Sequence, residues 1–286
     1  MPAAKKVKSE LQATKLSGSL GGEIRGIRLT EAGPVEAATI RSLLLEHLVL
    51  FFPGQQMTPD EHIAFGRLFG KLEGHPNLSF SAERPEFFEL HAIGGQGAIA
   101  DEWHSDLTCQ AEPSVIAILR MAKCPSVGGD TMWANMYKAY EELSPPMKEL
   151  CEGLTALHDS SKAHYYRVKA TDRQQMQFPN AEHPVVRTHP VTGRQGLFVN
   201  RGFTLRIPQL RKNESDALLE MLYRHVETPE FQCRFKWQPN SVAFWDNRCA
   251  QHHAMFDYFP HRRYGHRVTV CGDKPFYRAA QSTSPL

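Results

Sequence analysis

The run Leu48-Val49-Leu50-Phe51-Phe52, closed by Pro53-Gly54, is the stretch that decides the fold class. Every residue of the run is apolar, and the proline and glycine end it abruptly. A short apolar run that contains aromatic and β-branched residues and is bounded by turn residues is typical of a buried strand. The sequence therefore predicts a buried strand at 48–52.

Other short apolar runs predict further strands along the chain, at 113–121, 185–188, 196–199, 241–245 and 267–271. Helical spacing or helix-start signals predict fewer helices, at about 35–47, 58–70, 135–143, from 144 onwards and at 214–225. Because strands and helices do not alternate regularly, the pattern argues against a doubly wound parallel sheet. We expect a mainly β fold with helical insertions (α+β), built as a double-stranded β-helix (jelly roll) core flanked by helices.

Length and composition fit one globular domain. The chain has 286 residues, of which 41% are apolar and 22% charged, close to the averages of globular proteins. The first dozen residues are polar, so we expect 1–12 to form a flexible N-terminal arm and 13–286 a single domain. Residues 159–182 are polar and weakly patterned. We therefore expect this segment to form a loop or lid that covers an active site.

Charge, hydropathy and cysteine spacing exclude several classes of protein. A formal net charge of +2 gives no reason to expect nucleic acid as a partner. No run of about 18 apolar residues exists, so no membrane span is expected, and residues 1–10 lack the apolar core of a secretory signal. The six cysteines form no C-x-x-C pair, which is typical of reduced thiols in a cytoplasmic protein.

The first patch that carries chemistry is Trp103-His104-Ser105-Asp106. On a strand, residues i and i+2 point to the same face, so His104 and Asp106 can aim an imidazole and a carboxylate at one ion. Such a tripeptide also occurs by chance, and taken alone it favours a hydrogen-bonded pair at the surface over a metal site. The patch alone therefore leaves both interpretations open.

A second patch, around His252, favours the metal interpretation. A further imidazole would complete a facial triad of two histidines and one carboxylate, which suits Fe(II) because three coordination positions stay open. A structural zinc site would use four ligands, usually with thiolates. The open positions suit 2-oxoglutarate and dioxygen, and the far carboxylate of 2-oxoglutarate needs a cation such as Arg263, whose planar fork binds carboxylates bidentately.

Many segments of the chain, from about residue 14 to 278, together resemble one family. The clearest are Trp103-His104-Ser105-Asp106, Gly128-Gly129-Asp130-Thr131, Leu197-Phe198-Val199-Asn200, Trp245-Asp246-Asn247-Arg248 and Gly272-Asp273-Lys274-Pro275. The sequence resembles the taurine/dichlorophenoxyacetate dioxygenase family of non-haem iron enzymes that use 2-oxoglutarate. The resemblance implies Fe(II), with 2-oxoglutarate and O2 as cosubstrates, a small anionic substrate, and assembly as a homodimer or homotetramer.

The resemblance also assigns roles to individual residues. It implies that iron is bound by His104, Asp106 and His252. It implies that 2-oxoglutarate is bound by Thr131 and by Arg263. It places three further residues, His75, Phe203 and Arg267, around the substrate, with Arg267 and His75 on its anionic head.

The sequence departs from the family members that act on taurine. Ala100 replaces an asparagine and Leu78 a tyrosine, and Ala163-His164 stands in place of a serine-phenylalanine pair. We therefore expect an anionic head on a different, larger or more apolar body, as in sulfonates or alkyl sulfate esters. Two alternatives remain open: the same chemistry on an aryloxyalkanoate or other carboxylate, and a non-catalytic metal-binding sensor on the same fold.

Overall fold

The computed structural model describes residues 11, 13–74, 83–93, 101–164 and 178–279. Its largest unit is an eight-stranded sheet in which all but one of the strand pairings are antiparallel, the exception being β2 with β3. The order along the sheet is β1 (Ala13–Lys15), β2 (Gly22–Ile24), β3 (Val49–Phe52), β14 (Ser241–Asp246), β6 (Ile116–Lys123), β16 (Arg262–Val270) and β4 (Leu72–Glu73), with β5 (Phe88–Ile93) also paired to β16.

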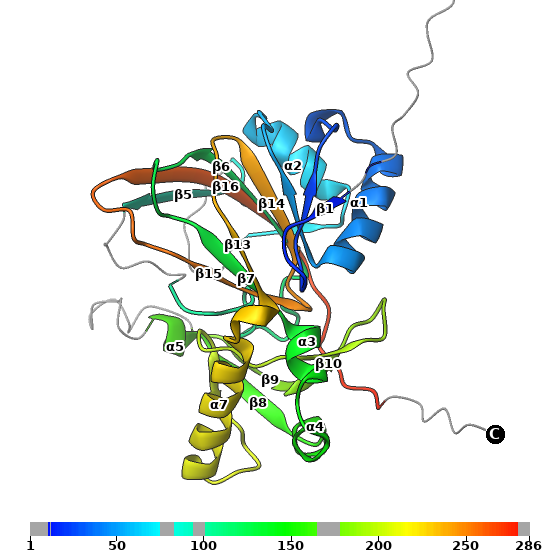
Figure 1. The fold of residues 1–286 in the computed structure, drawn as a ribbon, viewed down its shortest axis with the longest axis vertical. Helices are drawn as coiled ribbons and strands as arrows, with labels where there is room; N and C mark the ends of the chain where they lie inside the picture. The colour runs from blue at the N-terminus through cyan, green and yellow to red at the C-terminus, as the bar shows by residue number, and fades with distance from the viewer. Residues whose placement is uncertain (1–10, 12, 75–82, 94–100, 165–177, 280–286) are drawn as a thin grey trace, which may run out of the picture.

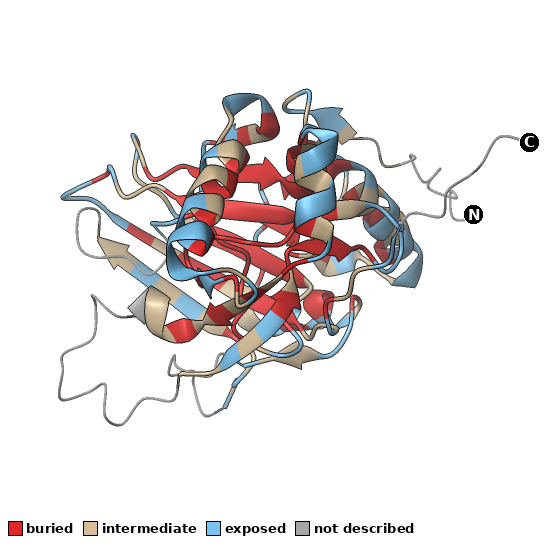
Figure 2. Ribbon diagram, turned by 90° about the horizontal axis from the view of Figure 1, so that it is seen from below, coloured by how far each residue is buried: buried red, intermediate tan, exposed pale blue. Residues whose placement is uncertain are grey.

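Two helices, α1 (Pro34–His47) and α2 (Pro59–Arg67), cover one face of this sheet (Figure 1). Alternate residues of β3 and β14 point to the two faces. Leu50 and Phe244 belong to the apolar cluster under the helices, whereas Phe51 and Trp245 belong to the cluster on the other face. Because both faces are covered, both strands are buried throughout; β3 is wholly apolar, and β14 is apolar from Val242 to Trp245. Figure 2 shows buried strands in the middle of the molecule.

A second sheet, of three strands, lies against the other face. Its order is β13 (Gln232–Phe235), β7 (Thr131–Asn135) and β15 (Ala250–Ala254). Trp133 of β7 packs edge to face on Phe51 and Trp245 of the large sheet, with ring centroids 5.2 and 5.8 Å apart. The two sheets therefore form a layered pair, and β15 and β16 bring residues of both layers to the candidate site.

The remaining elements build a helical and β region at one end of these layers (lower half of Figure 1). Its strands are β8 (Thr155–Asp159), β9 (Asn180–Pro184), β10 (Val186–Thr188), β11 (Gln195–Leu197) and β12 (Thr204–Arg206). Its helices are α3 (Met136–Glu141), α4 (Pro145–Glu152), α5 (Ser160–His164) and α7 (Lys212–Val226). Two 3-10 turns, η1 (Leu29–Glu31) and η2 (Pro229–Phe231), complete the described elements.

The fold is mainly β with helical insertions, so the predicted class is confirmed at that level. The predicted strand at 48–52 is β3, and the predicted helix at 35–47 is α1. The expected end of α2 at Gly70 was wrong: the helix ends at Arg67, with Leu68 as its C-cap. Of the expected lid at 159–182, residues 165–177 lie outside the described residues, and the rest belongs to β8, α5, β9 and their connections.

Two further expectations concern cysteines and membranes. All six cysteines lie among the described residues, and each is a free thiol. No helix within the described ranges is both long enough and apolar enough to cross a bilayer.

Candidate metal centre

His104, Asp106 and His252 lie together in the structure. Their potential ligand atoms are all within 4.8 Å of one another, and all three residues are buried. Nε2 of His104 is 4.0 Å and Nε2 of His252 is 3.9 Å from Oδ1 of Asp106. Three residues that are far apart in the sequence thus present two nitrogens and one oxygen to a common point.

The backbone brings the two histidines together through a single β-bridge. His104 donates its N–H to the carbonyl of His252 over 3.0 Å, and His252 donates to the carbonyl of His104 over 2.8 Å. The assumption that His104 and Asp106 share a strand was wrong, because a turn begins at Asp106 and Leu107 has a φ of 52°. The turn nevertheless directs the Asp106 carboxylate towards the imidazoles.

Burial keeps the two imidazoles neutral, and a hydrogen bond fixes the tautomer of His104. Nδ1 of His104 lies 2.7 Å from the carbonyl oxygen of Glu102, which can only accept, so Nδ1 carries the proton and Nε2 keeps its lone pair. Burial lowers the pKa of His104, and burial together with the neighbouring His104 lowers the pKa of His252 well below its usual value. A neutral imidazole is the form that binds a metal ion.

Asp106 is held in its ionised form. Burial raises its pKa, but the positive charge of Arg267, the two histidines and a hydrogen bond from Asn247 outweigh burial, and the net pKa is below the usual range. Arg267 donates from Nη1 to Oδ1 of Asp106 over 2.8 Å. The site therefore offers two neutral nitrogens and one charged oxygen.

This donor set fits a divalent ion of the Fe(II) or Mn(II) kind. Nδ1 of His252 has no partner among the described residues, and no fourth histidine, cysteine or carboxylate joins the group within those ranges. A closed zinc site would need a fourth protein ligand. Three ligands of mixed nitrogen and oxygen type instead leave positions open for small molecules.

A buried cation lies on β16, the strand that also carries Arg267. Arg263 on β16 is 3% exposed, donates from Nη1 to the carbonyl of Gly129 over 3.0 Å, and has no carboxylate partner within the described ranges. Its guanidinium carbon lies 5.6 Å from the ring centre of Phe256 and 5.9 Å from that of Tyr258. Its Nε is also without a partner there. Burying a charge without its counterion is costly, so Arg263 is suited to an anionic ligand.

Thr131 begins β7, two residues after the carbonyl that anchors Arg263. Its Oγ1 accepts a hydrogen bond from the indole N–H of Trp237 over 2.9 Å. The hydroxyl hydrogen of Thr131 is therefore free to point at another acceptor. Thr131 and Arg263 are thus both fixed by neighbours in ways that leave donors for a ligand.

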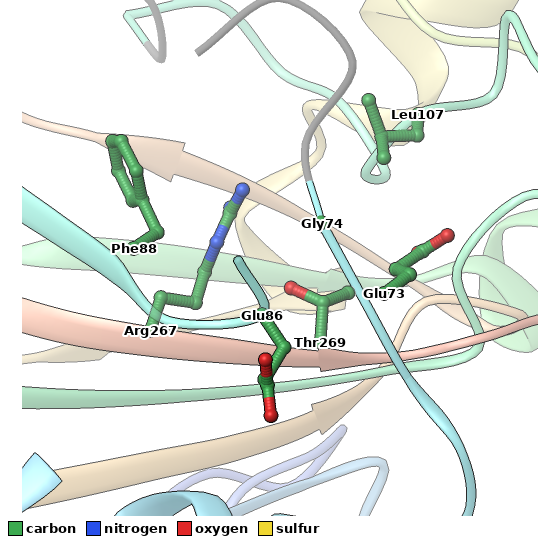
Figure 3. Close-up of a pocket in the computed structure, with 7 residues that line it drawn as sticks. All are labelled: Glu73, Gly74, Glu86, Phe88, Leu107, Arg267 and Thr269. Atoms are coloured by element: carbon green, nitrogen blue, oxygen red, sulfur yellow. The ribbon is translucent and has the colours of Figure 1, made fainter. Parts of the chain in front are cut away.

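The predicted substrate side is described in part. Arg267 lines a small pocket. The other lining residues are Glu73, Gly74, Glu86, Phe88, Leu107 and Thr269. Figure 3 shows Phe88 and Arg267 on one side of this pocket and Leu107 across from them. The ring of Phe203 lies 6.2 Å from that of His104, so Phe203 also borders the metal group. His75, Leu78 and Ala100 lie outside the described residues.

Sequence reasoning missed the residues that support these side chains. Glu73 and Leu107 carry no motif that marks them as pocket residues. Asn247 contacts Asp106 directly, yet the sequence offered only its place in a family motif as a signal. A second potential metal-binding group, His189, Asp246 and Cys249, is explained by the ion pair of Asp246 with Arg248, whose Nη2–Oδ2 distance is 2.6 Å.

The comparisons with known proteins agree with this geometry. The model of the taurine catabolism dioxygenase TauD, TfdA family matches residues 12–269. An alpha-ketoglutarate-dependent sulfate ester dioxygenase from Pseudomonas putida is 36% identical, covering 93% of this chain and 91% of that protein. The crystal structure of a taurine dioxygenase from Burkholderia xenovorans superposes with a TM-score of 0.81 at 37% identity, covering 93% of this chain and 91% of that one.

A further solved structure that this chain resembles is that of a complex with a metal ion. It is AAD-2 in complex with Mn(II) and N-oxalylglycine, with a TM-score of 0.79, 25% identity, and coverage of 94% of this chain and 100% of that chain. The family match over most of the sequence and the two structural similarities agree with the metal-binding geometry of His104, Asp106 and His252. The chain belongs to the TauD/TfdA dioxygenase family.

Proposed function

We propose that the protein is an Fe(II)- and 2-oxoglutarate-dependent dioxygenase that hydroxylates a small anionic organic substrate, a sulfonate or an alkyl sulfate ester. The observation that carries the proposal is the convergence of potential ligand atoms of His104, Asp106 and His252 within 4.8 Å of one another. Arg263, a buried cation with no carboxylate partner in the described part of the chain, supports it. In this proposal the strands form a jelly-roll core within a single domain, 13–286.

In this proposal, different residues bind the metal ion and 2-oxoglutarate. His104, Asp106 and His252 hold the metal ion on one side. Arg263 pairs with the distal carboxylate of 2-oxoglutarate, and Thr131 donates to a carboxylate of the same molecule. When bound, ferrous iron supplies the chemistry that reduces dioxygen at the expense of 2-oxoglutarate, which leaves as succinate and carbon dioxide.

The substrate side orients the anion. Arg267 has its Nη1 on Asp106, while its Nε has no partner in the described ranges and is available to a sulfate or sulfonate oxygen. Phe203, Phe88 and Leu107 form an apolar border that excludes water from the carbon beside the anionic group. His75, outside the described residues, is proposed to share the anionic head.

Hydroxylation at that carbon determines the products. A carbon that carries both the new hydroxyl and a sulfate or sulfonate group collapses to an aldehyde. The carbon–oxygen or carbon–sulfur bond breaks, and sulfate or sulfite leaves with its electron pair, while the hydroxyl proton passes to solvent.

A substrate panel tests this function. Purified protein is supplied with Fe(II), ascorbate, 2-oxoglutarate and one compound each from the alkyl sulfates, alkyl sulfonates and aryloxyalkanoates, and succinate is measured. We expect succinate with sulfate or sulfite for the first two classes. Succinate coupled only to phenol release would instead favour the aryloxyalkanoate alternative, and no succinate with any compound would favour a non-catalytic sensor.

A further inference from the structure

The motif Trp245-Asp246-Asn247-Arg248, at the end of β14, contains residues that no role in metal or cosubstrate binding accounts for. Asp246 and Arg248 pair with each other, with Oδ1 accepting from Nε over 2.8 Å, and Asp246 also accepts from His189 over 3.2 Å. These contacts join Asp246, Arg248 and His189 to one another, and none of them involves a residue of the metal group. Asn247 makes a different set of contacts.

Asn247 is 2% exposed and is bonded to Asp106 at two points. Its Oδ1 accepts the backbone N–H of Asp106 over 3.2 Å, and its Nδ2 donates to Oδ2 of the Asp106 carboxylate over 3.2 Å. The indole N–H of Trp245 donates to the same Oδ1 over 2.9 Å. The indole therefore fixes which end of the amide is the acceptor, and the donor end is left facing Asp106.

We propose that Asn247 is a positioning residue for the metal centre: it holds Oδ2 of Asp106 so that Oδ1 faces the two imidazoles, and Trp245 locks its amide in the orientation that does so. The inference rests on the proposed function, because it assigns a task only if Asp106 binds a metal ion. Groups that hydrogen-bond to a metal-binding carboxylate orient it and contribute to metal affinity.

The need for such a residue follows from the charge next to Asp106. Arg267 donates to Oδ1 over 2.8 Å, which is closer than either imidazole nitrogen. Without a bond to Oδ2, the carboxylate is free to rotate towards the arginine and away from His104 and His252. Asn247 opposes that rotation, and it also ties down the backbone from which the side chain extends.

The test substitutes the donor while keeping the shape. Asn247→Asp retains the acceptor for Trp245 and for the Asp106 N–H but loses the donor to Oδ2, and it places two carboxylates face to face. Asn135→Asp is the matched control, since Asn135 is also buried, donates from Nδ2 to Ser19 over 2.9 Å and caps α3, a role that aspartate fills well. Mn(II) affinity is measured for each full-length protein by the loss of the free-ion resonance signal, alongside the melting temperature.

We expect Asn247→Asp to weaken Mn(II) binding by about 10–100-fold. Asn135→Asp should bind Mn(II) with wild-type affinity, and both variants should be folded. Wild-type affinity in Asn247→Asp, or an equal loss in Asn135→Asp, overturns the inference. If wild-type protein binds no Mn(II), the proposed function itself fails and the inference falls with it.

Should Asn247→Asp not fold, Trp245→Phe decides the question. This variant keeps Asn247 and Asp106 but removes the N–H that orients the amide. We expect a smaller loss of Mn(II) affinity, of several-fold. An unchanged affinity in folded Trp245→Phe overturns the role of the indole, and with it the fixed orientation on which the inference depends.

Discussion

Nη1 of Arg267 donates to Oδ1 of Asp106 over 2.8 Å, and that same oxygen lies 3.9 Å from Nε2 of His252. The arginine proposed to bind the substrate anion thus contacts the carboxylate proposed to bind the metal ion. If both proposed roles hold, we expect substrate binding and the environment of the metal to be coupled through this one oxygen atom.

Arg267→Lys tests the anion-binding role. Lysine keeps the charge but loses the planar fork, so it cannot hold Asp106 and a sulfate oxygen together. We expect KM for the sulfur-containing substrate to rise about tenfold to a hundredfold, as for the loss of a charged hydrogen bond worth about 1.5–3 kcal/mol. The 2-oxoglutarate dissociation constant should change little. An unchanged KM would place the anion elsewhere.

Arg263→Lys and Arg262→Lys form a matched pair on β16. Arg263 is buried and Arg262 is exposed, although they are neighbours in the sequence. Because only Arg263 is buried and bonded to the Gly129 carbonyl, its substitution should raise the 2-oxoglutarate dissociation constant by about tenfold or more. Calorimetric titration of both variants with Mn(II) present measures this. Equal effects of the two substitutions would contradict the assignment.

His104→Ala and His253→Gln separate metal ligands from neighbouring histidines. His104 presents Nε2 to Asp106, whereas the ring of His253 lies against Trp103, 5.5 Å between centroids. We expect His104→Ala to abolish succinate formation and weaken metal binding strongly, because two protein ligands rarely retain the ion. His253→Gln should remain active. Substrate-dependent succinate release at the wild-type rate in His104→Ala would contradict the metal site.

A buried histidine outside the site predicts a pH dependence of stability. Burial lowers the pKa of His62 to about 3, and the side chain is fully buried. Between pH 6.5 and 3 the unfolded chain binds a proton at His62 that the folded protein does not. The group therefore destabilises the fold as pH falls, by up to about 1.4 kcal/mol per pH unit.

His62→Gln removes the group that binds this proton in the unfolded chain. Urea unfolding of wild type and variant at pH 4.5, 5.5 and 7.5 measures the slope of the unfolding free energy against pH. Between pH 4.5 and 5.5 we expect the variant's slope to be smaller by about 1.4 kcal/mol per unit. Parallel slopes would mean that the folded protein protonates His62 as readily as the unfolded chain does.

The predictability of the fold followed from burial. Strands β3 and β14 are covered on both faces, so β3 and the Val242–Trp245 part of β14 are continuous apolar runs, and both strands were predicted. Strand β15 reads Ala-Gln-His-His-Ala and β5 is only half-buried, so neither has a distinctive local pattern, and both were missed. The strand predicted at 267–271 missed the first half of β16, because residues 262–266 are largely polar and form no apolar run.

The candidate site divides in the same way. His104, Asp106 and His252 were predicted because their side chains suit an iron site and because the segments around them resemble one family. The bond between Asn247 and Asp106 joins residues 141 positions apart. No local pattern marks such a contact, since an asparagine after a strand is also a common turn residue. Supporting contacts of this kind become visible only when the chain is folded.

Gly202→Ala tests how closely the site is packed. A Cβ at Gly202 would lie 3.0 Å from Cβ of His104, while the backbone of Gly202 is tied to Trp103 by a hydrogen bond of 3.2 Å. A shift of Gly202 strains its bond to Trp103, and a shift of His104 displaces the imidazole. Overpacking of this kind costs about 1–3 kcal/mol, so we expect a lower melting temperature.

The displacement should also reach the metal group, because His104 would have to shift away from Asp106. We therefore expect Gly202→Ala to weaken Mn(II) binding as well as stability. Gly18→Ala is the control, since Gly18 is exposed and a Cβ there meets nothing within 4 Å. A folded Gly202→Ala with wild-type Mn(II) affinity would show that His104 yields without losing its place. The 3.0 Å contact would then restrict the fold but not the metal centre.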